Sequence, residues 1–61
     1  MTMATDLQTK VEKYEARALQ CQQHAREARD KAERGFYEEL AAYYASLATD
    51  FRTVIEKRSA A

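Results

Sequence analysis

The most informative stretch of this 61-residue sequence, at positions 36–55, is FYEELAAYYASLATDFRTVI. Its apolar residues recur every three or four positions, which is the spacing of one face of an α-helix. The main stripe consists of Tyr37, Leu40, Tyr44, Leu47, Phe51 and Val54. The residues that widen it are Phe36, Tyr43 and Ile55 on one flank and Ala41 and Ala48 on the other. Because this stripe is much broader than a single helix–helix seam, it predicts contact with more than one neighbour.

The preceding segment carries a second helical pattern. Its apolar positions alternate in steps of four and three, as in a heptad seam, and are Leu7, Val11, Tyr14, Ala18, Cys21, Ala25, Ala28 and Ala32. After Tyr14 these side chains are small, so a neighbouring backbone can approach closely and a bulky partner face is expected. In a bundle of two copies, the residues expected to fill the space are Leu40, Tyr44, Leu47, Phe51 and Val54.

The connection between the two patterns allows three interpretations. Asp30-x-x-Glu33 has the spacing of a capping box, which predicts that a new helix begins just after Asp30. Gly35 is instead a candidate for the residue that ends a longer first helix. The third interpretation is one continuous helix. Residues 26–38 hold opposite charges four positions apart, and the apolar positions 25, 28, 32, 36, 40, 43 and 47 fit an eleven-residue repeat.

The first residues lack the basic and apolar regions of a secretory signal peptide, which predicts a cytoplasmic protein. The single cysteine agrees with a reducing compartment and cannot form a disulfide framework. Thr5-x-x-Gln8 has the capping-box spacing, so Thr5 or Asp6 is expected to cap the first helix.

Composition excludes several classes of protein. The chain is 46% hydrophobic and balances ten basic against ten acidic residues, which argues against a disordered tail and against a general nucleic-acid binder. The longest apolar run, residues 40–45, is far shorter than the roughly 18 residues of a membrane span. The basic rim needed by a membrane-surface helix is also poor. We therefore expect neither nucleic acid nor membrane as a partner.

Chain length points to self-association. For a chain of 7.0 kDa the hydrophobic gain and the entropic cost of folding nearly cancel, and two helices cannot reach the burial of a compact domain. No disulfide is possible within the chain, since it has one cysteine. The remaining source of stability is a second copy, so we expect an oligomer.

Two parts of the sequence resemble a group of short uncharacterised proteins of rhizobia and other alphaproteobacteria. These parts are Tyr14-x-x-x-Ala18-x-x-Cys21-x-x-x-Ala25 and Leu40-Ala41-x-x-Tyr44-x-x-Leu47-Ala48. The similarity spans roughly residues 10 to 50. This sequence has Asp30-Lys31 where the family often has Asp-Pro, and Tyr44 where the family often has Trp. The resemblance implies a helical hairpin of unknown function and brings no catalytic residue with it.

Cys21 and His24 are the candidates for chemistry. They lie three positions apart on one helix, so a two-fold dimer could assemble a tetrahedral Cys₂His₂ metal site. The favoured interpretation is a small apolar Cys21 in the seam with a partly solvated His24 beside it. His24 is the only base near the thiol, and nothing in the sequence marks an oxyanion site. We therefore predict neither an enzyme nor a cofactor.

The remaining features have structural interpretations. The aromatic residues stand at helical spacing and are interpreted as core, with a groove for a partner's helix as the alternative. The basic residues near the connection alternate with acidic ones and are interpreted as solvated surface rather than a phosphate site; they are Arg26, Arg29, Lys31 and Arg34. Leu19 lies outside the seam and is expected to be exposed.

The fold predicted from the sequence is all-α. A single domain, residues 1–61, forms an antiparallel two-helix hairpin with helices at about 6–29 and 32–57, and two copies close into a four-helix bundle. The expected function is a non-catalytic oligomerisation or protein-interaction module. Its predicted interface consists of Tyr37, Leu40, Tyr44, Leu47, Phe51 and Val54. The alternatives are a groove that binds a helix of another protein and a metal-binding dimer through Cys21 and His24.

Overall fold

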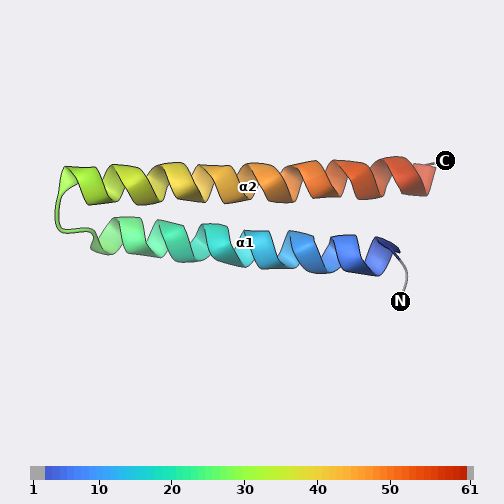
Figure 1. Cartoon of the computed structure of the whole chain (residues 1–61), viewed down its shortest axis with the longest axis horizontal. Helices are drawn as coiled ribbons and strands as arrows, with labels where there is room; N and C mark the ends of the chain where they lie inside the picture. Colours follow the sequence, from blue (N-terminus) through green and yellow to red (C-terminus); the bar gives the residue numbers. More distant parts are fainter. Residues whose placement is uncertain (1–2, 61) are drawn as a thin grey trace.

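In the computed structural model the chain forms two antiparallel α-helices that lie side by side (Figure 1). Helix α1 spans Met3–Glu27 and helix α2 spans Lys31–Ala60. The structure describes the backbone of residues 3–60 and the side chains of residues 6–59. The predicted all-α hairpin is confirmed, and the interpretation as one continuous helix is wrong.

Both helices extend further at their outer ends than the sequence indicated. Helix α1 begins at Met3, so Thr5 and Asp6 lie inside the helix rather than at its cap. The side chain of Thr5 is outside the described part. Helix α1 ends at Glu27, two residues before the expected position, and α2 continues to Ala60, three residues beyond it. Basic residues in the last turn of α2 favour this extension because they complement the helix dipole.

The turn is short and depends on Asp30. The Glu33 backbone N–H donates to Asp30 Oδ1 at 2.8 Å, and the Arg29 N–H donates to Glu33 Oε1 at 2.9 Å. The Ala28 N–H donates to the Ala25 carbonyl at 3.2 Å and closes the end of α1. Asp30 therefore caps the start of α2, as the Asp30-x-x-Glu33 spacing predicts, and the Glu33 carboxylate reaches back to the N–H of Arg29 rather than to that of Asp30. The Gly35 interpretation is wrong, because Gly35 lies within α2 and does not have a positive φ.

Small residues form the centre of the contact between the helices. The buried residues are Val11, Ala18, Cys21 and Ala25 of α1 with Ala41 and Ala48 of α2. The predicted seam of α1 is confirmed from Leu7 to Ala28, all of which are buried or half-buried. Ala32 does not continue it, because this residue lies in α2 and is exposed.

The seam of α2 differs in phase from the predicted stripe. Its members, all buried or half-buried, are Tyr37, Ala41, Tyr44, Ala48, Phe51 and Ile55. Leu40 and Leu47 are half-buried and Val54 is 39% exposed; each precedes a seam residue and lies on a flank of the contact rather than at its centre. The physical reason is the small size of the residues at the centre. Alanines facing alanines allow a close approach that leaves no room for a leucine.

Aromatic rings cover the seam near its middle. The Tyr14 ring stacks on Tyr44 and on Phe51, with ring centroids 5.9 and 5.8 Å apart. On the opposite flank Arg52 of α2 pairs with Glu15 of α1. These contacts between distant parts of the sequence fix the antiparallel register.

The two helices of the described residues 3–60 form a single layer. Its Cα atoms extend 47 × 18 × 10 Å along the principal axes. Within the described part no side chain is completely buried. Neither described helix combines the length and the hydropathy needed to cross a bilayer.

Candidate functional site

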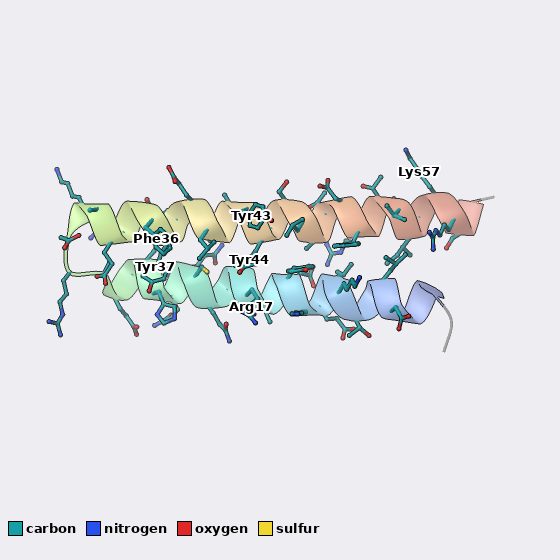
Figure 2. All side chains as sticks on the ribbon, in the orientation of Figure 1. Arg17, Phe36, Tyr37, Tyr43, Tyr44 and Lys57 are labelled. Carbon is teal, nitrogen blue, oxygen red and sulfur yellow. The ribbon has the colours of Figure 1, made fainter. Side chains whose placement is uncertain are left out.

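One flank of the hairpin carries a row of apolar residues on α2, interrupted by Asp50 between Leu47 and Val54. We call this surface the aromatic stripe; its members are Phe36, Leu40, Tyr43, Leu47 and Val54. Each member directly precedes a residue of the α2 seam, so the stripe lies beside the seam rather than in it. In Figure 2 the labelled Tyr37 and Tyr44 reach toward α1, whereas Tyr43 lies over α2 itself.

The aromatic stripe is only partly covered within the chain. The exposed fractions are 59% for Phe36, 58% for Tyr43 and 39% for Val54, whereas Leu40 and Leu47 are half-buried. The rings of Phe36 and Tyr43 contact the tyrosine that follows each of them, with centroids 5.2 and 5.6 Å apart. These contacts leave the outward faces of the rings open to solvent. Exposed apolar surface of this extent marks an interaction site more often than an inert surface.

Charged residues border the aromatic stripe on the side of α1. Lys13 and Arg17 line a shallow groove of about 300 Å³ together with Tyr43 and Leu47. The Lys13 Nζ lies 5.9 Å from the centre of the Tyr14 ring, within the range of a cation–π contact. The stripe therefore combines an apolar centre with a basic rim, which is the layout of a protein interface.

The two ends of the aromatic stripe also carry charges. Glu33 precedes Phe36 by three positions and Lys57 follows Val54 by three, so both continue the helical spacing of the stripe. Both side chains are exposed. Asp50 is the one acidic residue at this spacing between Leu47 and Val54.

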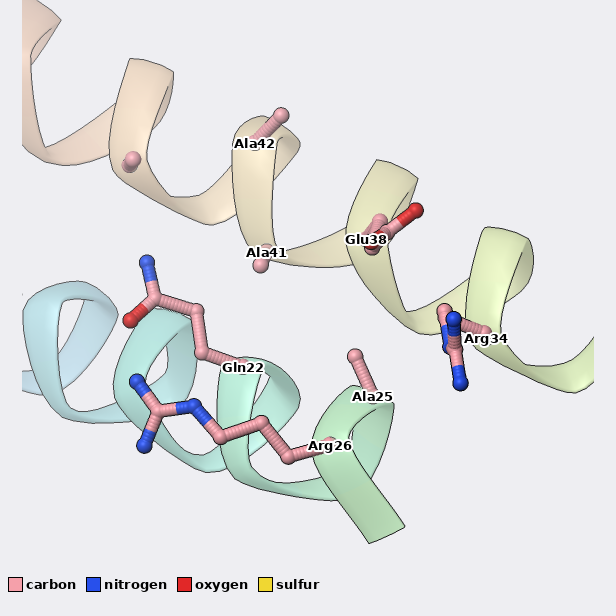
Figure 3. A pocket seen from close by; sticks show the side chains of 8 residues that line it. Gln22, Ala25, Arg26, Arg34, Glu38, Ala41 and Ala42 are labelled. Carbon is pink, nitrogen blue, oxygen red and sulfur yellow. The ribbon is translucent and has the colours of Figure 1, made fainter. Parts of the chain in front are cut away.

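The opposite flank holds a groove with a different character. Its volume is about 650 Å³, and its lining residues are Gln22, Ala25, Arg26, Arg34, Glu38, Ala41, Ala42 and Ala45. Figure 3 shows Gln22 and Arg26 on α1 opposite Ala41 and Ala42 on α2. A neighbouring groove of about 410 Å³ includes Leu19, which is 66% exposed as expected. The four basic residues near the turn are all exposed, which agrees with a solvated surface.

Cys21 and His24 lie in different environments. Cys21 is buried in the seam, whereas His24 is exposed and packs against the Tyr37 ring with centroids 5.0 Å apart. Among the described residues no three His, Cys, Asp or Glu side chains come together as metal ligands would. A single hairpin therefore does not assemble these two residues into a site.

The six residues predicted as an interface divide into two groups. Tyr37, Tyr44 and Phe51 lie in the seam against α1, while Leu40, Leu47 and Val54 belong to the aromatic stripe. The sequence pattern predicts Phe36 and Tyr43 as core, whereas both are largely exposed in the single hairpin. The signal that could have identified them is their phase, since they share the helical spacing of Leu40 and Leu47.

Comparison of the chain with protein-family models, with curated proteins and with solved structures finds no match. The resemblance to the rhizobial proteins stays an expectation.

Proposed function

We propose that this protein is a non-catalytic self-association module, in which two hairpins pair through the aromatic stripe and close into a four-helix bundle. The observation that carries the proposal is the exposure of Phe36 and Tyr43 beside the half-buried Leu40 and Leu47. These side chains lie on one face of α2, so a second hairpin can cover all of them at once. Pairing of this kind is how two-helix hairpins usually complete a hydrophobic core.

Surface area supports the proposal. The hairpin exposes 4909 Å², whereas a compact monomer of its mass exposes about 4,000 Å². The excess of about 900 Å² is close to the roughly 800 Å² that each partner buries in a standard protein interface. A dimer through one flank would thus restore the burial expected of a compact fold.

The composition of the seam between α1 and α2 also supports the proposed self-association. Five of the six buried residues are alanine or cysteine, and the sixth is Val11. Small side chains remove little apolar surface from water, so the seam contributes modestly to stability. Burial of two phenylalanines, two tyrosines and four leucines between copies would add the larger share.

A second function is favoured by the alanine-lined groove on the opposite flank. Its open floor admits a helix, and Arg26 and Arg34 at its edge suit an acidic amphipathic helix of another protein. A designed helical peptide with leucines and glutamates at helical spacing is the probe. NMR shifts confined to Ala42 and Ala45 would support this function, and an unchanged spectrum would contradict it.

Light scattering of matched variants tests the self-association. Leu47→Glu places a charge within the aromatic stripe, and Leu19→Glu makes the same change on the opposite flank. We expect the wild type and Leu19→Glu to have the mass of a dimer, about 14 kDa or twice 7.0 kDa, and Leu47→Glu to be a helical monomer. A dimeric Leu47→Glu, or a folded wild-type monomer, would contradict the proposal.

A further inference from the structure

We infer that the two hairpins pair through an antiparallel α2–α2 contact, with the two-fold axis at the level of residue 45. This inference rests on the proposed self-association and specifies its geometry. It follows from the order of residues along the aromatic stripe and its charged ends.

The stripe and its ends form a regular heptad series. The residues occur in steps of three and four, and they are Glu33, Phe36, Leu40, Tyr43, Leu47, Asp50, Val54 and Lys57. Such a series drifts slowly around a straight helix, and a left-handed supercoil of two helices keeps it in contact. The series is symmetric about position 45, since each member has a counterpart at the same distance on the other side.

An antiparallel pairing about that centre matches the chemistry of the counterparts. Glu33 lies opposite Lys57 of the partner subunit, so the contact has an ion pair at each end. Phe36 then faces the partner's Val54, and Tyr43 faces the partner's Leu47. Every apolar residue except Leu40, which faces the partner's Asp50, thus has an apolar counterpart, as the layers of an antiparallel coiled coil require.

Two of the three other arrangements place like charges together, and the third loses an apolar contact. A parallel pairing sets Glu33, Asp50 and Lys57 each against its own copy. An antiparallel pairing shifted by one heptad toward the N-terminus sets Glu33 against the partner's Asp50. A shift in the other direction removes Phe36 from the contact and sets Leu40 against the partner's Lys57. Like charges directly opposite one another are destabilising, and the second shift leaves Phe36 uncovered, so charge and apolar burial together favour the register centred at residue 45.

The structure also places Glu33 and Lys57 where each is accessible to a partner subunit. Glu33 accepts the Arg29 N–H through Oε1, which fixes this carboxylate at the start of α2. Lys57 extends away from α1 in Figure 2 and is exposed. On the α1 side the contact ends at Lys13 and Arg17. Removing these two cations from water would cost more free energy than the burial of further surface would gain.

Distances between spin labels test the arrangement. In a Cys21→Ala background, a single cysteine replaces Ser46 or Ser59, both exposed on α2. At 1.5 Å per residue, the antiparallel pairing separates the two labels along the axis by about 3 Å at position 46 and about 42 Å at position 59. We expect a short distance at the first site and a long one at the second.

Any other pair of distances overturns the inference, and the pattern identifies the alternative arrangement. Short distances at both sites indicate a parallel dimer, and a long distance at position 46 indicates a different surface. Either result leaves the proposed self-association intact. A folded monomer in sedimentation experiments overturns both the inference and the proposed function.

Charge reversal gives an independent test. Lys57→Glu sets a glutamate against Glu33 at both ends, and we expect it to weaken the dimer about tenfold at low salt. Arg58→Glu is the matched control, because it makes the same change at the same helix end but outside the stripe. Equal weakening by both variants would overturn the end-to-end pairing.

Discussion

Replacement of Ala48 by leucine is the most informative test of how the hairpin is packed. Ala48 is only 3% exposed and lies where α2 faces the small residues of α1. Three additional carbon atoms at this position have no space unless the helices separate. Overpacking of this kind typically costs about 1–3 kcal/mol. At about 4–8 °C per kcal/mol for a domain of this size, the melting temperature is expected to fall by at least about 4 °C.

Ala45 offers a matched control for this replacement. It lies three residues away on the same helix and is exposed, so Ala45→Leu makes the same chemical change without entering the seam. We expect its effect to stay within about 0.5 kcal/mol. Both variants should be melted by circular dichroism at one protein concentration, because dimer formation makes the melting temperature depend on concentration. If Ala48→Leu melts no lower than Ala45→Leu, the small-residue seam described above is wrong.

Three further predictions concern the turn, helix α2 and metal binding. Gly35→Ala should stabilise the protein by about 0.5–1 kcal/mol in urea denaturation, because a Cβ there meets nothing within 4 Å and glycine is a poor helix former; destabilisation would refute the helical environment of Gly35. Asp30→Ala should cost about 1 kcal/mol in the same assay, since the Glu33 N–H loses its acceptor; an unchanged midpoint would show that the cap contributes nothing. Zinc content after purification without an affinity tag should be below one ion per dimer, because Cys21 is buried apart from the exposed His24; a stoichiometric ion would establish the metal-site alternative.

The sequence predicted those parts of the fold that depend on local pattern. The seam of α1 could be identified because only one set of apolar positions runs from Leu7 to Ala28. The turn could be assigned because Asp30 precedes Glu33 by three positions, the spacing at which the Asp30 carboxylate accepts the Glu33 N–H. Both features depend on residues close together in the chain.

The phase of α2 could not be predicted in the same way. Two apolar series, one through Leu40 and Leu47 and one through Ala41 and Ala48, fit helical spacing equally well. The choice between them depends on how closely the two backbones approach, which is a property of both helices together. Pattern reasoning favoured the bulkier series for the contact, whereas the structure places alanines there and leaves the leucines on the flank.

Which of the two apolar series forms the seam of α2 also determines the candidate site. Once Ala41 and Ala48 occupy the seam, Phe36 and Tyr43 must lie on the outside, because they share the phase of the leucines. The wide stripe was correctly identified as a feature of α2, but its exposed members could be named only from the packed structure.

The dependence of thermal stability on concentration tests most directly the claim that a second copy completes the fold. Thermal unfolding should be followed by circular dichroism over a hundredfold range of protein concentration. If folding and dimerisation are coupled, mass action raises the melting temperature steadily as the concentration increases. A melting temperature that is the same at every concentration would show that the single hairpin is stable alone, and would contradict the account.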